Sequence, residues 1–306
     1  MAFSLRKSSS RPPVGLDIDG RYLAAVESEG GRIARAASSE LPDGLVRDGE
    51  VADVDGLASA LKNFASQAGL PKSVRLGVAN QQIVVRAIDL PVIENDAERD
   101  AAVRFQAAEA IAMPLDEAVL DYQIAAFEQD GEGTERMRVV LVAARRAMVE
   151  AFVAAAKKAG LKPEGIDLDA FALMRVLADD PGESARVYCH LGAVTNLAIG
   201  VGSSCLFTRP LATVWDSEHA AAQLADEIRL SIDYYMAQLN ARPVGEALLS
   251  GPGSRDQELV DSLASHLGLP TSVAAPLGRL DVSHLEPGED PHRYTVAAGL
   301  ALEAAA

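Results

Sequence analysis

The sequence has little of three things that would each point to a particular class of protein: cysteine, basic charge and long apolar runs. It contains two cysteines, Cys189 and Cys205, without a CxxC spacing, which disfavours a disulfide scaffold or a zinc site and predicts two small core residues. Lys and Arg total 28 against 44 Asp and Glu, a net charge of −16, which argues against broad contact with nucleic-acid phosphates. Apolar stretches such as Val139–Ala144 have strand length, far short of the roughly 18 residues of a membrane helix. We therefore expect a cytoplasmic protein with no membrane span of its own and no nucleic-acid partner.

Three common catalytic sequence motifs are also missing. The sequence contains no GxSxG, HExxH or P-loop pattern, which removes the usual hydrolase, protease and P-loop interpretations. No catalytic residue is predicted on this basis.

Three segments share a pattern that marks the end of a helix. The three segments are Gly69-Leu70-Pro71, Gly160-Leu161-Lys162-Pro163 and Gly268-Leu269-Pro270, and each follows an amphipathic run. Glycine adopts the left-handed conformation after a helix, and proline prevents the helix from continuing. Helices that give way to strands in this manner predict α/β layers.

A further helix is predicted in the middle of the chain. It opens at Asn95, with Glu98 three residues later as in a capping box. The spacing gives it one predicted apolar side, formed by Ala97, Ala101, Phe105, Ala108 and Ala112. Before it, 74–79 and 83–90 are predicted strands separated by a short polar turn.

An internal repeat indicates the architecture. VGLDIDGRYLAAVESEGGRIARA from Val14 and VYCHLGAVTNLAIGVGSSCLFTR from Val187 both read as three apolar runs separated by turns that contain glycine. The alignment places Asp17 opposite His190. Two related α/β halves are therefore expected, with a ligand cleft between them.

In the order and spacing of several segments, the sequence resembles the PilM family of type IV pilus assembly, which belongs to the actin-like ATPases. The resemblance lies in LPDGLVRDGEVADVDGLASALKNF, VVRAIDLPVIEN, AAVRFQAAEAIAMPLDEAVLDYQI, VVLVAARRAMVEAFVAAAKKAGLKPEGIDLDAFALMRVL, LADEIRLSIDYY and YTVAAGLALEA. It implies a duplicated actin-like fold, related to ribonuclease H, with an inserted small α+β subdomain. We expect a flexible leader at 1–13, a first half at 14–186 with the insert at about 72–165, and a second half at 187–306.

The resemblance also implies a partner and a cofactor. The partner is a PilN-like inner-membrane protein, bound through its cytoplasmic N-terminal peptide, which would recruit this chain to the inner face of the cytoplasmic membrane. The cofactor is ATP with magnesium, placed in the cleft between the halves. The function implied is that of a scaffold in pilus assembly, with at most a weak ATPase activity.

The nucleotide site implied by the resemblance has three parts. They contain Asp17, Gly20 and Arg21 in the first hairpin, Gly192, Thr195 and Asn196 in the second, and Gly251 and Gly253 in a third turn. Asp17 would hold magnesium through water.

The sequence departs from the family pattern in each part of this site. Asp19 stands where the first turn should have glycine, His190 replaces an expected acid, and Pro252 separates the two glycines of the third turn. An additional carboxylate beside triphosphate oxygens is unfavourable in a low-dielectric cleft. A neutral imidazole is a poor magnesium ligand. The alternative interpretation of His190 is an interior residue held by hydrogen bonds.

Two other functions are consistent with an actin-like fold. One is a cell-division protein of the FtsA kind, which ends in a basic amphipathic helix, whereas GLALEAAA at the end of this sequence has no such pattern. The other is an actin-fold small-molecule kinase, which needs intact phosphate turns. Both fit the sequence less well than the pilus scaffold.

Overall fold

The computed structural model describes residues 12–129, 133–178, 184–238, 241–277, 280 and 290–302. The chain forms two compact units. The main unit contains the described residues up to Gln81 and from Ala151 onward, and the inserted unit comprises Gln82–Glu150. Apart from its last two residues, the leader expected at 1–13 lies outside the described residues.

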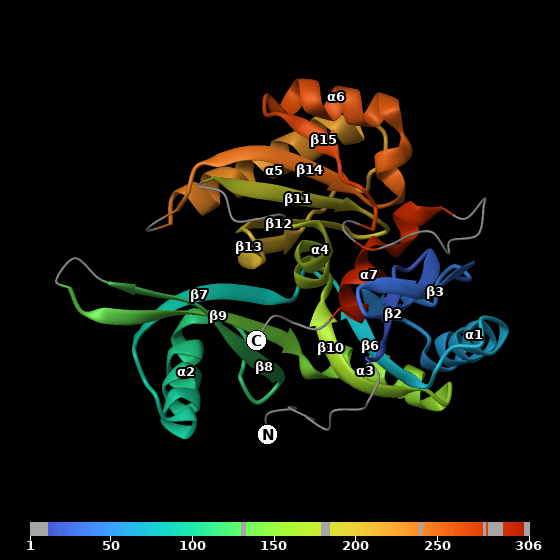
Figure 1. Cartoon of the computed structure of the whole chain (residues 1–306), viewed down its shortest axis with the longest axis horizontal. Helices are drawn as coiled ribbons and strands as arrows, with labels where there is room; N and C mark the ends of the chain where they lie inside the picture. Colours follow the sequence, from blue (N-terminus) through green and yellow to red (C-terminus); the bar gives the residue numbers. More distant parts are fainter. Residues whose placement is uncertain are drawn as a thin grey trace. The chain divides into compact units, whose positions relative to one another are not determined.

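The main unit contains two five-stranded sheets (Figure 1). The first has the order β10-β6-β1-β2-β3, with strands β1 (Val14–Ile18), β2 (Tyr22–Glu29), β3 (Arg32–Glu40), β6 (Ser73–Val78) and β10 (Lys162–Leu168). The second has the order β13-β12-β11-β14-β15, with strands β11 (Ala185–Leu191), β12 (Thr195–Val201), β13 (Ser204–Pro210), β14 (Val244–Ser250) and β15 (Thr271–Val273). A two-stranded ribbon of β4 (Val46–Arg47) and β5 (Glu50–Val51) follows the first three strands.

The two sheets repeat one topology, as the internal repeat of the sequence predicts. In each, a central strand pairs with the next strand along the chain in antiparallel fashion, and on its other side with a later strand in parallel fashion. Strands β1 and β11 are the equivalent central strands. Strands β6 and β10 belong to the first sheet. Strand β6 lies inside the range 72–165 expected for the insert, and β10 begins inside it and ends at Leu168.

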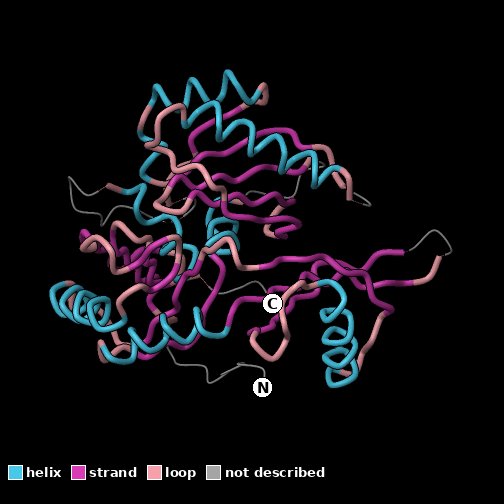
Figure 2. Tube along the Cα trace, turned by 180° about the vertical axis from the view of Figure 1, so that it is seen from behind, coloured by secondary structure: helices cyan, strands magenta, loops and turns pink. Residues whose placement is uncertain are grey.

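Helices form layers around and between the sheets. Helices α5 (Ala220–Met236) and α6 (Gln257–Leu267) pack against one face of the second sheet, where Val187, Cys189 and Leu249 are buried. Helices α4 (Asp169–Leu177) and α7 (Thr295–Ala301) share a core with β2 of the first sheet and with β11 and β12 of the second. The two helices therefore lie between the sheets, and Figure 2 shows this arrangement from behind.

Side-chain alternation fixes which residues face this central layer. At Gly15, a Cβ atom would lie 2.0 Å from the Ala297 carbonyl oxygen, so this strand position faces α7. Residues two apart on a strand point to the same side. Asp17 therefore faces the central layer, while Leu16 faces the opposite side of the first sheet.

The predicted helix ends are confirmed at all three glycines. A glycine with positive φ follows each of three helices: Gly69 after α1 (Val54–Gln67), Gly160 after α3 (Arg146–Lys158) and Gly268 after α6. Of α3, the part from Ala151 onward belongs to the main unit. The Leu70 N–H donates to the Ala65 carbonyl and the Gly69 N–H to the Ser66 carbonyl. These paired hydrogen bonds satisfy carbonyls that the end of the helix leaves free.

The start of α1 supports a simple stability test. Asp53 Oδ1 accepts hydrogen bonds from the N–H groups of Asp55 at 3.1 Å and Gly56 at 2.9 Å. Asp53→Ala should lower the free energy of unfolding by about 1 kcal/mol, because two helix N–H groups lose their acceptor. Asp53→Asn keeps an acceptor oxygen and is the matched control in urea unfolding. Equal losses in the two variants would show that the cap is not the cause.

The inserted unit is a three-stranded antiparallel sheet with one helix. The sheet order is β7-β9-β8, with β7 (Val84–Pro91), β8 (Ala118–Gln129) and β9 (Glu135–Arg145). Helix α2 (Asp96–Ala110) begins after Asn95, whose Oδ1 accepts from the Ala97 and Glu98 N–H groups, so the predicted N-cap is confirmed.

The predicted apolar side of α2 is wrong. Val103 and Ala107 pack with Leu90 and Met137 in the core of the inserted unit, whereas Ala97, Ala101, Ala108 and Ala112 are exposed and the Phe105 side chain is 67% exposed. Four of the five predicted residues are alanines, which gain little from burial. The branched Val103 decides instead which side of the helix faces the sheet.

Within the described ranges, none of the helices is long and apolar enough to cross a membrane. Both cysteines are buried, with free thiols. Burial raises the pKa of each thiol to about 12, so both are un-ionised near neutral pH and serve as small core residues, as expected.

Candidate functional site

The repeated central strands place Asp17 and His190 at equivalent positions. Asp17 lies near the end of β1 and His190 near the end of β11, and each projects toward the layer that contains α4 and α7. Both side chains are buried, with 3% and 5% exposure. Two polar groups at the ends of equivalent strands are thus directed into the same region of the main unit.

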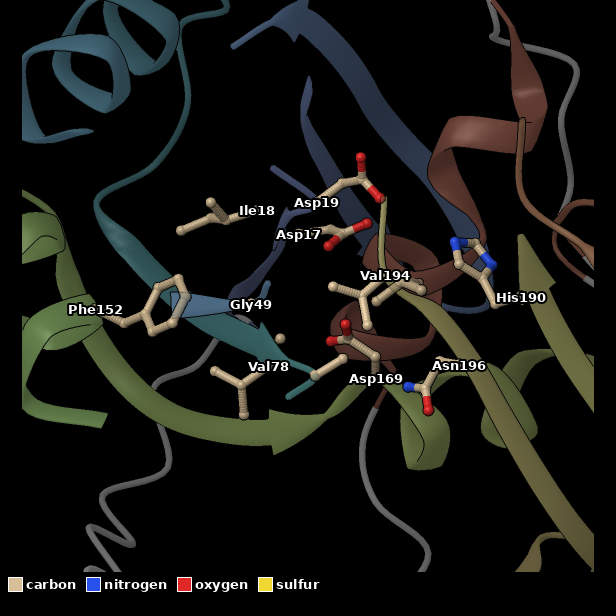
Figure 3. Close-up of a pocket in the computed structure, with 13 residues that line it drawn as sticks. Asp17, Ile18, Asp19, Gly49, Val78, Phe152, Asp169, His190, Val194 and Asn196 are labelled. Atoms are coloured by element: carbon tan, nitrogen blue, oxygen red, sulfur yellow. The ribbon is translucent and has the colours of Figure 1, made fainter. Parts of the chain in front are cut away.

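A small cavity lies between these strand ends. Its volume is about 20 Å³, enough for about one water molecule. Figure 3 shows Asp17, Asp169, His190 and Asn196 around it. Among the described residues, Asp169 Oδ1 and Asn196 Oδ1 have no hydrogen-bond partner. The cavity is therefore lined by side chains that carry buried polar atoms without a hydrogen-bond partner in the described part of the chain.

Asp169 is a site residue that the sequence reasoning did not identify. It is the first residue of α4 and follows directly after β10. At Gly77 on the neighbouring strand, a Cβ atom would lie 2.3 Å from Asp169 Oδ1, so glycine makes room for the carboxyl group. An acid that directly follows a buried strand and opens a helix, as in GIDLDAF, is the sequence signal that could have indicated it.

Burial and nearby negative charge suppress the ionisation of both Asp17 and Asp169. Burial raises the pKa of Asp169 to about 8, with the charges of Asp19 and Asp167 as further causes. Burial, followed by the charges of Asp169 and Asp19, raises the pKa of Asp17 well above its ordinary value. The pair therefore retains a proton near neutral pH, because burial disfavours the charged carboxylates and neighbouring negative charges disfavour them further.

His190 behaves as an interior residue. Its Nδ1 lies 3.1 Å from Ser250 Oγ at the end of β14, and burial lowers its pKa to about 4. The imidazole is neutral near pH 7, and it joins the second hairpin to the turn that contains Gly251. The interpretation of His190 as an interior imidazole held by a hydrogen bond is consistent with this geometry.

Asp19 bridges the two hairpins. Its Oδ2 accepts a hydrogen bond from the Ala193 N–H at 2.7 Å, and its Oδ1 accepts one from the Arg21 N–H at 3.3 Å. Burial raises the pKa of Asp19 to about 6, while those two N–H groups and the charges of Arg21 and Arg293 lower it. The carboxylate is therefore mostly ionised near neutral pH, and the two N–H groups and the two arginines offset part of the cost of its burial.

Arg21 forms a second bridge between the halves. Its guanidinium donates to both carboxylate oxygens of Asp216, at 2.7 and 3.1 Å, and lies 5.8 Å from the centre of the Trp215 ring. The hydrogen bond to Arg21 lowers the pKa of Asp216. Both side chains of the ion pair are 44% exposed, so this contact adds orientation and little stability.

A larger pocket opens beside these bridges. Its volume is about 450 Å³, within the range of small-molecule sites in proteins. Its lining comes from both hairpins and from the third turn, and includes Asp19, Arg21, Gly192, Trp215, Pro252 and Arg293. Arg293 donates to Glu40 at 2.6 Å, and Arg255 donates to Asp290 at 3.1 Å. The pocket thus has an aromatic wall and a rim of paired charges.

The residues expected from the sequence fall into three groups. Asp17 and Asn196 line the small cavity, and Arg21 and Gly192 line the larger pocket. The other four, which line neither space, are Gly20 with φ +109°, the buried Thr195 at the start of β12, Gly251 with φ +85°, and Gly253, where a Cβ atom would lie 2.6 Å from the Trp215 ring.

ATP with magnesium does not fit this arrangement as it stands. The Ala193 N–H, an amide that a phosphate could use, is already engaged by Asp19. A Cβ atom at Gly192 would lie 2.5 Å from Asp19 Oδ2, so no space separates the carboxylate from the second hairpin. In the part of the chain that the structure describes, no three His, Cys, Asp or Glu residues are placed to hold a metal ion. The larger pocket has room for a nucleoside, but the space for its phosphates is taken.

Comparisons with known proteins agree with the duplicated architecture. The family described as type IV pilus assembly protein PilM matches residues 15–195. A chain of a PilM–PilN type IV pilus biogenesis complex is 25% identical, with a TM-score of 0.80, and the match covers 95% of this chain and 97% of that one.

Two further solved structures are similar in fold alone. The ethanolamine utilization protein EutJ from Carboxydothermus hydrogenoformans is 12% identical, with a TM-score of 0.53 over 94% of this chain and 88% of its own. A Bacteroides thetaiotaomicron protein with an actin-like ATPase fold is 11% identical, with a TM-score of 0.50 over 99% of both chains. These findings confirm the predicted actin-like fold class.

Proposed function

Because the chain belongs to the family of type IV pilus assembly protein PilM, we propose that it is a scaffold of pilus assembly that binds the cytoplasmic N-terminal peptide of a PilN-like inner-membrane protein. The observation that carries this proposal is the similarity to a chain of the PilM–PilN complex over 95% of this sequence. Through this partner the protein is held at the inner face of the cytoplasmic membrane.

The proposal is tested by calorimetric titration of the full chain with a synthetic peptide. The peptide covers the cytoplasmic N-terminal segment of the PilN-like protein from the same organism, and a scrambled peptide of equal charge is the control. We expect saturable binding of the first peptide alone, because an extended segment is recognised by the order of its side chains. Because the chain carries a net charge of −16, equal binding of both peptides would indicate charge attraction and contradict the proposal.

A second candidate function is nucleotide binding, favoured by the larger pocket. In this proposal the Trp215 side of the pocket receives the nucleoside. The second hairpin receives the phosphates, with the backbone at Gly192 and the polar side chains of Thr195 and Asn196. The first hairpin contributes Gly20 and Arg21, and the glycines at 251 and 253 allow the backbone to approach the ligand closely. Asp17 is the residue that would hold magnesium through water. This arrangement requires the Asp19 carboxylate to leave the second hairpin first, because it now occupies the Ala193 N–H group. The departures at Asp19, His190 and Pro252 favour binding without efficient hydrolysis.

A further inference from the structure

We propose that Asp19 is an internal anion that occupies the phosphate position of the second hairpin and must be displaced before a nucleotide can bind there. The inference rests on the proposed nucleotide function of the larger pocket and concerns its regulation. It begins from one contact, the 2.7 Å hydrogen bond from the Ala193 N–H to Asp19 Oδ2.

The hydrogen bond between Ala193 and Asp19 resembles the contact of a backbone N–H group with a bound anion. Ala193 follows Gly192, and the absence of a side chain at Gly192 is what lets the carboxylate approach, because a Cβ atom there would lie 2.5 Å from Asp19 Oδ2. Backbone N–H groups in such turns are common donors to phosphate oxygens. A carboxylate on this N–H group therefore excludes a phosphate from it.

The surrounding charges also favour an anion at this position. The guanidinium groups of Arg21 and Arg293 both act on the Asp19 carboxylate. Each is held in place by an acid of its own, Asp216 for Arg21 and Glu40 for Arg293. Arg293 also stacks at 5.1 Å over the ring of Tyr22. The same two guanidinium groups would also act on a phosphate that took the place of the carboxylate.

The closed contact joins the two halves of the duplicated fold. Asp19 lies in the first hairpin and Ala193 in the second, 174 positions later in the chain. Behind the contact, the small cavity has space for about one water molecule. Displacement of Asp19 is therefore the step that makes room between the hairpins, and an added phosphate competes directly with the carboxylate for the same N–H group.

The experiment measures the affinity of the full chain for ATP and for adenosine in wild type, Asp19→Ala and Asp19→Asn. We expect Asp19→Ala to bind ATP roughly 10- to 100-fold more tightly than wild type, since the phosphate no longer competes with a charged hydrogen-bond acceptor. Affinity for adenosine, which has no phosphate, should change much less than affinity for ATP. Asp19→Asn keeps an acceptor oxygen without the charge and should give a smaller gain.

Hydrogen exchange at the Ala193 amide supplies a readout that does not depend on a ligand. The amide should exchange more rapidly in Asp19→Ala than in wild type, and circular dichroism confirms that the variant is folded. Equal ATP affinity in the two proteins, with adenosine bound by both, would overturn the role of Asp19 and leave the nucleotide pocket standing. If neither wild type nor any variant bound ATP or adenosine, both proposals would fall: the nucleotide function of the pocket and the displacement of Asp19 by phosphate. Unchanged exchange at Ala193 would show that the bridge does not form.

Discussion

Replacement of Asp169 by Asn should stabilise the protein at about pH 8 by roughly 3 to 5 kcal/mol, the largest gain that we expect from a single substitution. The pKa of Asp169 is raised to about 8 in the folded protein, and its value in an unfolded chain is near 4. Between about pH 4 and pH 8 the folded state therefore holds a proton that the unfolded state has lost. The free energy of unfolding falls as the pH rises through this window, and Asn removes that loss.

Urea unfolding at about pH 5 and about pH 8 tests this expectation. The wild type should be less stable at the higher pH, and Asp169→Asn should show a smaller difference between the two pH values. The raised pKa values of Asp17 and Asp19 account for the difference that remains. The pKa of Asp17 should also fall in the variant, because the charge of Asp169 is the second largest cause of its elevation. Asp55→Asn is a suitable control, since the Asp55 side chain is 84% exposed and pairs with Lys158; its effect should stay within about 0.5 kcal/mol. A loss of stability in Asp169→Asn at both pH values would contradict the prediction.

Gly299→Ala should destabilise the protein by about 3 kcal/mol or more, through overpacking between α4 and α7. A Cβ atom at Gly299 would lie 1.9 Å from the Ala172 carbonyl oxygen and 2.4 Å from the Ala172 carbonyl carbon. These are backbone atoms of α4, so no side chain is free to rotate away and the two helices must separate. Because α4 begins at Asp169, separation of the helices would also disturb the small cavity.

The matched control for this change is Gly165→Ala. Gly165 lies in β10, and a Cβ atom there would have its nearest neighbours at 3.9 Å, both in the Arg75 side chain, which is ordinary van der Waals contact. Thermal unfolding should show a large fall in midpoint for Gly299→Ala and a small change for Gly165→Ala. If the two variants lost equal stability, the close approach of α4 and α7 would not be the cause.

Much of the fold could be predicted because its signals are local. Gly69, Gly160 and Gly268 follow helices because only a residue without a side chain adopts their backbone conformation readily. Asn95 caps α2 through N–H groups two and three residues later. The duplicated sheets could be predicted from an internal sequence repeat, because each half forms three successive strands from neighbouring residues. The apolar side of α2 was not predictable, since alanine specifies a buried face only weakly and the partner surface decides.

The order of residues along the chain was enough to predict the duplicated α/β halves, the helix ends and the placement of Asp17 and His190 at equivalent strand ends. Three contacts became visible in the folded chain: Asp169 lies beside Asp17 at the small cavity, Asp19 accepts from the Ala193 N–H, and Arg21 pairs with Asp216, 195 positions away. The physical reason is that hydrogen bonds and charge repulsion depend on distances of a few ångströms between atoms. Spacing along one chain fixes such distances within a helix or a hairpin, whereas across the two halves they follow from how the sheets pack on α4 and α7.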